Sequence, residues 1–292
     1  MDEREALARI AAGLPAAGDD AAVVDGLVLT TDMLHERADF PAGTSRYTAG
    51  WRAVGASLSD VAAMGAEAVA AVAIYGAPTF DPDELDAFLK GARSVCRAVG
   101  AEYVGGDLDD HQEFTVATTA VGETDEPVYR KGASPGEVVC VTGSLGRSAA
   151  AIRLFEAGEA ERANDLFRFE PRVEAGLAVA PHATSMMDSS DGLARSLHQL
   201  AEASDCGFAV GRDALPIADV VGEVADDAED ALEMGVFFGE DFELVFTVGE
   251  DDVEDVRETA PVPVTVVGEV TDSGVEMDGE PLADRGYTHG ES

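Results

Sequence analysis

Aspartates beside glycines or hydroxyl residues recur at five places in the sequence. In chain order the clusters are Gly18-Asp19-Asp20, Thr30-Thr31-Asp32, Ser59-Asp60, Gly105-Gly106-Asp107 and Asp188-Ser189-Ser190-Asp191-Gly192. All except Ser59-Asp60 lie next to an apolar run that predicts a strand. Carboxylates on loops at strand ends can converge on one hard cation, and magnesium prefers such ligands together with water and phosphate oxygens. The pattern therefore indicates a site for magnesium and phosphate chemistry.

Most of these residues also have a purely structural interpretation as turns, strand ends or helix caps: Asp19, Asp20, Asp32, Asp107, Ser190 and Asp191. Asp60 differs, because it falls in a helical pattern among small residues, where a buried acid is costly unless it is paired. The two glycines before Asp107 indicate close approach of the backbone to a ligand. A helix cap and an anion site are compatible after Asp188, since a helix N-terminus attracts anions.

Known catalytic and phosphate-binding signatures are absent. The sequence has no GxxxxGK[ST] loop, no GxGxxG ahead of a lysine, no HExxH and no GxSxG. Val141–Gly146 reads as a strand and a Gly-x-x-Gly turn into a helix, which can present N–H groups to phosphate, although packing is the commoner reason for that pattern. Arg130 is one of few cations near the candidate phosphate loops, although a lone arginine is usually a surface residue.

The composition is strongly acidic. Formal net charge is −39 over 292 residues, and Lys90 and Lys131 are the two lysines. No basic face is available for nucleic acid. With 46% hydrophobic residues the chain can fold, and molar salt would screen carboxylate repulsion because the Debye length then falls to about 3 Å. We therefore expect a halophilic protein. Acidic pairs also occur by chance in such a chain, so acidity alone assigns no function.

The length allows two domains, and we place the boundary at a Gly- and Pro-containing joint, giving domains 1–132 and 133–292. Strands and helices are mixed without a regular βαβ repeat, which predicts an α/β (α+β) fold. No apolar stretch predicts a membrane helix or a signal peptide. Three scattered cysteines indicate a reducing compartment, so we expect a cytoplasmic protein.

The expected elements follow from apolar periodicity. Helices are predicted over residues 2–12, 44–65, 81–99, about 146–158, 172–179 and 193–203. Strands are predicted over 21–24, 27–31, 68–75, 102–104, 113–121, 138–142, 242–247, 262–267 and 275–277. Residues 105–111 are predicted to form a loop between two of these strands.

Seven motifs in order resemble a known family: GDDAAVV, LTTDMLHERADF, SLSDVAAMGA, GGDL, YRKGASPGEVVCVTGSLG, MDSSDGL and FGEDFELVF. The resemblance is to thiamine-monophosphate kinase, within the aminoimidazole ribonucleotide synthetase superfamily, and it runs from about Ala17 to Tyr287. It implies an N-terminal mixed sheet that pairs across a homodimer and a C-terminal α/β domain. It also implies transfer of phosphate from ATP to thiamine monophosphate with several Mg²⁺ ions, and it leaves a K⁺ requirement open.

The resemblance also assigns residues. The implied metal ligands are Asp20, Thr30, Thr31, Asp32, Asp60, Asp107, Asp188 and Asp191, of which we count Asp32, Asp107 and Asp191 as catalytic. The implied nucleotide contacts are Gly105, Gly106, Arg130 and Ser190, and the implied substrate contacts are Asp39, Glu240 and Tyr287. The sequence departs from the family pattern at Ser57, Ser189 and Phe238, and Asp39 stands where a histidine can occur.

Two alternatives stay open at this point. One is another member of the superfamily, such as a ribonucleotide synthetase, a selenophosphate synthetase or a hydrogenase-maturation enzyme. Selenophosphate synthetase fits poorly, because no reactive cysteine precedes the first aspartate cluster. The other is a non-catalytic module, which would bind ATP and metal through the same loops without turnover.

Overall fold

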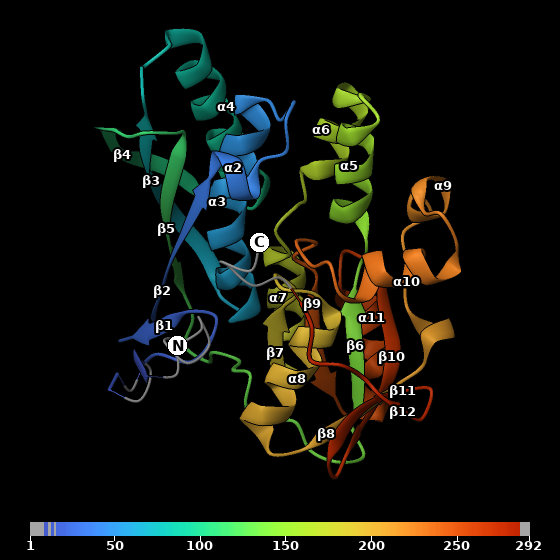
Figure 1. The fold of residues 1–292 in the computed structure, drawn as a ribbon. Helices are drawn as coiled ribbons and strands as arrows, with labels where there is room; N and C mark the ends of the chain where they lie inside the picture. The colour runs from blue at the N-terminus through green and yellow to red at the C-terminus, as the bar shows by residue number, and fades with distance from the viewer. Residues whose placement is uncertain (1–8, 11–12, 15, 287–292) are drawn as a thin grey trace.

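The computed structural model describes residues 9–10, 13–14 and 16–286 (Figure 1). The helix predicted over residues 2–12 therefore lies outside the described residues except at Arg9 and Ile10, which are helical. Two sheets form the framework of the molecule, one from each half of the chain. Within the part of the chain that the structure describes, no helix is both long and apolar enough to cross a membrane.

The first sheet has five strands in the order β1-β2-β5-β3-β4. Their bounds are β1 (Ala22–Val24), β2 (Leu27–His35), β5 (Thr115–Glu123), β3 (Glu67–Ala77) and β4 (Glu102–Asp110). The β3–β4 pair is parallel and the others are antiparallel. Helices α3 (Arg46–Ala63) and α4 (Pro82–Ala98) pack against this sheet, and the short α2 (Glu36–Asp39) follows β2.

The second sheet has seven strands in the order β12-β11-β8-β10-β6-β9-β7. Their bounds are β12 (Glu280–Pro281), β11 (Gly274–Met277), β8 (Gly207–Val210), β10 (Val264–Thr271), β6 (Val138–Thr142), β9 (Leu244–Val248) and β7 (Ser185–Asp188). Its helices are α5 (Arg147–Glu156), α6 (Ala160–Phe167), α7 (Val173–Val179), α8 (Leu193–Ser204), α9 (Val221–Val224), α10 (Ala228–Val236) and α11 (Val253–Thr259), with 3₁₀ turns η1 (Arg212–Ala214) and η2 (Glu250–Asp252).

Helix α3 is the element that joins the two halves. It contacts the first sheet, and it also contacts α7 and β7 of the second half. Its close packing depends on small residues. A Cβ on Gly50 would lie 2.2 Å from the carbonyl oxygen of Phe88 in α4, and one on Gly176 of α7 would lie 2.3 Å from that of Ala62. Functional side chains on α3 therefore lie where both halves meet.

The mixed α/β fold class is confirmed, but one prediction about the elements is wrong. Residues 105–110 were expected in a loop, yet they continue β4, because β3 pairs in parallel with it as far as Asp110. Helices α6, α10 and α11 and strands β7 and β8 were also missed, and each of them is short. Strand β2 runs four residues beyond the prediction, so Thr30, Thr31 and Asp32 lie inside a strand rather than at its end.

Candidate functional site

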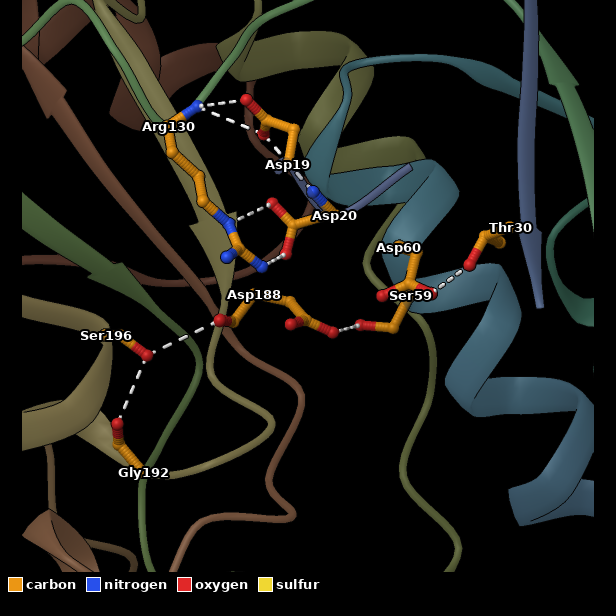
Figure 2. A network of polar contacts seen from close by, with 9 residues as sticks. All are labelled: Asp19, Asp20, Thr30, Ser59, Asp60, Arg130, Asp188, Gly192 and Ser196. Carbon is orange, nitrogen blue, oxygen red and sulfur yellow. Dashed lines mark hydrogen bonds and ion pairs between the residues drawn. The ribbon is translucent and has the colours of Figure 1, made fainter. Parts of the chain in front are cut away.

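Three of the predicted ligands meet in space although they lie far apart in the sequence. Asp20 precedes β1, Asp60 lies near the end of α3, and Asp188 is the last residue of β7. One carboxylate oxygen from each lies within 4.8 Å of the others, as Figure 2 shows. Asp188 is 1% exposed and Asp20 and Asp60 are half-buried, so this group of carboxylates lies where the two halves meet. We call these three residues the aspartate cluster.

Hydroxyl groups and one arginine orient the aspartate cluster (Figure 2). The Thr30 hydroxyl donates to Asp60 Oδ2 at 2.5 Å, and the Ser59 hydroxyl donates to Asp188 Oδ2 at 2.6 Å. Arg130 donates to both carboxylate oxygens of Asp20, with Nη2–Oδ1 at 2.8 Å and Nε–Oδ2 at 3.3 Å. Each carboxylate thus has a fixed direction before any ligand arrives.

The electrostatics of the aspartate cluster favour a cation. Burial, and then the charge of Asp20, raise the pKa of Asp188 to about 7. Burial, and then the charge of Asp188, raise the pKa of Asp60 well above its ordinary value. Asp188 Oδ1 is buried and has no hydrogen-bond partner among the described residues. An unpartnered carboxylate oxygen facing two further carboxylates is the donor set that a divalent ion such as Mg²⁺ fits.

The remaining predicted ligands are distributed around the aspartate cluster. Asp32 lies close enough to both Asp60 and Glu240 for its charge to raise both of their pKa values, and Asp191 acts in the same way on Asp188. Thr31 instead directs its hydroxyl to the Thr118 carbonyl at 2.8 Å. Asp32 and Asp191 are therefore neighbours of the aspartate cluster, whereas the side chain of Thr31 is engaged within the sheet.

Asp107 is not brought to the aspartate cluster within one chain. It lies in the same cross-strand row as Ile74, Ala117 and Met33. Since β4 is three strands away from β2, this register separates Asp107 from Met33 by about 14 Å. Gly105, Gly106 and Asp107 instead line a cavity of ≈ 500 Å³ beside α4, together with aromatic side chains that sequence reasoning missed: Tyr75, Phe88 and Tyr103.

A second cavity, of ≈ 750 Å³, contains both described substrate candidates, Asp39 and Glu240, in its wall. It also contains charged and aromatic side chains from α2 and the residue after it, from α3, from the end of α6 and from the loop after α10: Glu36, Arg37, Phe40, Arg46, Phe167 and Phe238. Asp39 accepts a hydrogen bond from the His35 backbone N–H at 2.6 Å. Tyr287, the third substrate candidate, lies outside the described residues.

The loop that carries Glu240 is attached to the loop that carries Asp188. Glu240 N–H donates to the Ser190 carbonyl at 2.7 Å, and Phe242 N–H donates to the Ser189 carbonyl at 3.2 Å. Both Glu240 and Phe242 have positive φ, of 63° and 54°, which is rare for such residues and is often found at functional sites. The wall of the larger cavity and the end of β7 therefore form one connected structure.

The start of α5 is not a phosphate site. Asp241 fills it, because its carboxylate accepts hydrogen bonds from the backbone N–H groups of Gly146 at 2.5 Å and Ser148 at 2.9 Å. Glu243 occupies the preceding turn in the same way, accepting from Thr142 and from the backbone of Ser144. Packing is thus the correct interpretation of Val141–Gly146, as sequence reasoning had allowed.

The fold and the aspartate cluster define a protein of the AIR synthase class. Residues 18–124 match the family described as AIR synthase related protein, N-terminal domain, and residues 134–278 match its C-terminal domain. A curated thiamine-monophosphate kinase from Halobacterium salinarum is 63% identical over 291 residues, which cover 99% of this chain and 100% of that protein. The chain belongs to the thiamine-monophosphate kinase family.

Two further comparisons agree with this assignment. A thiamine-monophosphate kinase from Methanospirillum hungatei is 39% identical, with 99% of each chain covered. A solved structure described as AaThiL complexed with AMPPCP and TMP has a TM-score of 0.89 and 27% identity, covering 99% of this chain and 97% of that chain. The family predicted from the seven motifs is confirmed, and the other members of the superfamily are set aside.

Proposed function

We propose that this protein transfers the terminal phosphoryl group of ATP to thiamine monophosphate, giving thiamine diphosphate and ADP. The observation that carries the proposal is the aspartate cluster, in which Asp20, Asp60 and Asp188 converge between the two halves of a chain of this family. Both reactants are polyanions, so the main barrier to their meeting is electrostatic, and a chain with two lysines needs metal ions to overcome it.

We assign Mg²⁺ to the aspartate cluster, with Thr30, Thr31, Asp32, Asp107 and Asp191 as further ligands carried over from the family motifs. Bound there, Mg²⁺ would neutralise phosphate oxygens and stabilise charge in a loose transition state. The protein's own part is to orient the carboxylates through Thr30, Ser59 and Arg130. No general base is needed, because the second pKa of a phosphate monoester is about 6 and the acceptor oxygen is largely deprotonated near neutrality.

The two cavities suit the two reactants. The one beside Gly105 and Gly106 has an aromatic and aliphatic lining that suits the adenine of ATP. Arg130 and Ser190, assigned to the nucleotide phosphates, do not line this cavity, so they would contact a nucleotide held by the same cavity of a second chain. The larger one combines Asp39 and Glu240 with phenylalanine rings, which suits the positively charged thiazolium ring of thiamine monophosphate. The charge of Asp32 raises the pKa values both of Glu240, in the wall of this cavity, and of Asp60, in the aspartate cluster. A residue that contacts the reacting phosphates should lie near both.

We also propose that the protein is a homodimer that pairs through the first sheet. Apolar side chains on this sheet are exposed in the single chain, including Met33 at 51%, Val72 at 36% and Ile74 at 48%. Exposed apolar patches of this kind mark interaction sites. Asp107 lies in the same cross-strand row as Met33 and Ile74. Pairing at this face would therefore bring Asp107 toward the aspartate cluster of a second chain, although it does not reach the cluster of its own chain.

Three finer expectations remain proposals. The division into 1–132 and 133–292 is supported by the ends of the two family matches, at residues 124 and 134. A cytoplasmic location is supported by cysteines that form no disulfide: Cys96, Cys140 and Cys206. A K⁺ requirement has no structural support, and replacing KCl by NaCl in the activity assay would test it.

An assay of ADP release tests the proposed activity. Purified protein in molar KCl is supplied with ATP, Mg²⁺ and thiamine monophosphate, and thiamine diphosphate is measured in parallel. We expect equimolar ADP and thiamine diphosphate, and no ADP when thiamine replaces the monophosphate. Binding of ATP without turnover of either compound would instead support the non-catalytic module.

A further inference from the structure

Arg52 is a buried cation at the place where α3 meets the second half of the chain. Its side chain is 1% exposed. The guanidinium lies 3.6 Å from the ring centroid of Phe167, and Nη1 donates to the Phe167 carbonyl at 2.5 Å and to the Ser148 hydroxyl at 3.3 Å. A buried charge is costly unless a counter-charge compensates it, so its position requires an explanation.

The counter-charge is Glu240, in the wall of the larger cavity. Arg52 Nη2 donates both to Glu240 Oε2 and, at 3.4 Å, to the Glu240 carbonyl oxygen. The Glu240 side chain is 21% exposed, so it faces the cavity while Arg52 behind it does not. Arg52 thus fixes the one wall residue that combines an acidic side chain with a left-handed backbone, at φ 63°.

The other charges around Glu240 oppose its ionisation. Burial raises the pKa of Glu240, the Arg52 charge lowers it, and the nearby carboxylates Asp39 and Asp32 raise it again. The cavity wall carries further charged groups, which are Glu36, Arg37 and Arg46. Of these, Arg46 is already paired with Glu36 and with Glu84 of α4. Arg52 is therefore the cation in direct contact with Glu240.

We propose that Arg52 is a positioning residue that holds Glu240 as a fixed negative charge in the cavity wall, so that the cavity selects a substrate with a positively charged ring. This inference rests on the proposed function, because the thiazolium ring of thiamine monophosphate supplies that charge. The inference goes beyond the proposed function, because it makes Arg52, a residue outside the cavity, responsible for the preference of the cavity for a cationic ring.

Two substrates that differ in one charge test this proposal. Thiamine monophosphate has a cationic ring, whereas the phosphate ester of 3-deazathiamine has a neutral ring of the same shape. The KM of each is measured in molar KCl for the wild type and for Arg52→Met, Arg52→Lys and Glu240→Gln, with the KM for ATP and a thermal melt as controls. The readout is the ratio of the two KM values, which general loosening of the fold does not change.

We expect the wild type to prefer the cationic substrate by at least about tenfold, since a desolvated charge pair contributes at least that much to affinity. Arg52→Met and Glu240→Gln should lose most of this preference, and Arg52→Lys should retain it. In Arg52→Met the pKa of Glu240 loses the charge that lowers it and rises further, so the KM for the cationic substrate should fall as pH is raised. A wild type without preference, or an Arg52→Met variant that keeps it, overturns the proposal.

Arg52→Met leaves a buried carboxylate unpaired and can fail to fold, so the double variant Arg52→Met/Glu240→Gln is included. Recovery of the melting temperature in the double variant supports the charge pair, whereas a double variant as unstable as the single one shows that Arg52 acts by packing and overturns the proposal. Absence of thiamine monophosphate turnover by the wild type contradicts the proposed function itself and is seen before any variant is compared.

Discussion

Asp188 is the residue on which the metal assignment depends most directly. It is 1% exposed, its Oδ1 has no hydrogen-bond partner among the described residues, and its Oδ2 is held by Ser59. A buried carboxylate with an unpartnered oxygen destabilises a fold unless it serves a ligand. Asp188 should therefore lower the stability of the metal-free protein and support the activity of the metal-bound protein. Both effects can be measured.

Replacing Asp188 by Asn should lower turnover by about a hundredfold or more, because one charge that holds the cation at the phosphates is lost. Raised Mg²⁺ should restore part of the activity. Without metal, the variant should melt at a higher temperature than the wild type, since repulsion within the aspartate cluster is relieved. Turnover against Mg²⁺ and thermal melts in a chelator measure both effects.

Glu254→Gln is a matched control for this variant, because it removes one acidic charge at a side chain that is 78% exposed and should change neither quantity. Near-normal turnover of Asp188→Asn would show that this carboxylate is a structural part of the β7 loop. A lower melting temperature without metal would show that the aspartate cluster is already compensated within the protein.

The raised pKa values of Asp188, at about 7, and of Asp60 predict how the metal-free protein responds to pH. An acid whose pKa is higher in the folded than in the unfolded state stabilises the fold below its unfolded value, and that stabilisation is lost as pH rises through the folded value. The metal-free protein should therefore lose stability as pH rises from about 4, near the unfolded pKa, to about 7, the folded pKa of Asp188. Thermal melts across this range test the expectation.

Mg²⁺ should remove most of this pH dependence, because the cation holds the carboxylates ionised and competes with protons. For the same reason its apparent affinity should weaken as pH falls below about 7. Asp188→Asn should make the metal-free profile less steep, and the slope that remains comes from other buried acids with raised pKa values, such as Asp60 and Asp241. A wild-type profile that is flat, or that rises with pH, would contradict the electrostatics of the aspartate cluster.

Sequence patterns were informative at the residue scale where chemistry restricts the residue type. Asp20, Asp60 and Asp188 were predicted as ligands, and the structure brings them together. Arg52 was missed, because an arginine in a helical pattern reads as a surface residue unless its partner is known. That partner, Glu240, lies 188 positions away, so no local pattern could reveal the pair.

Strand β4 is the clearest difference between expectation and structure at the scale of elements. Gly-Gly-Asp is a poor strand sequence by intrinsic preference, and a loop was the reasonable prediction. Pairing with β3 outweighs that preference, as Ala73 pairs with Gly106 and Ile74 with Asp107. Sequence periodicity describes one element at a time, whereas β4 is stabilised by its hydrogen bonds to β3.

Gly105 and Gly106 provide a matched pair of tests of this element. Their φ values are 155° and 158°, so alanine costs similar backbone strain at both. A Cβ on Gly106 would lie 1.8 Å from the Ala73 carbonyl oxygen, whereas a Cβ on Gly105 meets nothing within 4 Å. Gly106→Ala should therefore destabilise the fold by roughly 3 kcal/mol or more relative to Gly105→Ala, measured by urea unfolding in high salt.

Gly105→Ala should affect the nucleotide instead. If ATP lies against this stretch of β4, the new methyl group intrudes into its cavity, and the KM for ATP should rise while the KM for thiamine monophosphate does not. An unchanged KM for ATP in a folded Gly105→Ala variant would remove Gly105 from the nucleotide site. Equal stability of the two variants would contradict the β3–β4 register.

Net charge acts at the scale of the whole molecule. At −39, carboxylate repulsion extends over the surface, and weak salt screens it poorly. We expect folded structure to be lost as KCl is lowered from molar toward millimolar concentration, and to return when salt is restored. Circular dichroism and activity across a KCl series measure this. A native spectrum with full activity in millimolar salt would contradict a halophilic protein.

The exposed face of the first sheet predicts the assembly of the molecule. Val72, Ile74 and Met33 are 36%, 48% and 51% exposed in the single chain, and β4, which pairs with the strand of Val72 and Ile74, presents an unpaired sheet edge. Pairing of two copies would bury this surface, and salt strengthens rather than weakens apolar association. Light scattering in high salt should therefore report about twice the 30.3 kDa chain mass.

Charge placed on that face should separate the two copies. Ile74→Glu should give a monomer with an intact circular dichroism spectrum, because the side chain is exposed in the single chain and its replacement disturbs no core contact. Leu177→Glu, at a side chain 41% exposed on α7 in the other half, is the matched control and should stay dimeric. If Asp107 acts from the second chain, the Ile74→Glu monomer should also lose turnover. Adding wild-type protein should not restore the activity of the variant chains, because they cannot pair. A wild type that is monomeric at micromolar concentration, or an Ile74→Glu variant that stays a fully active dimer, would show that this face does not join two copies.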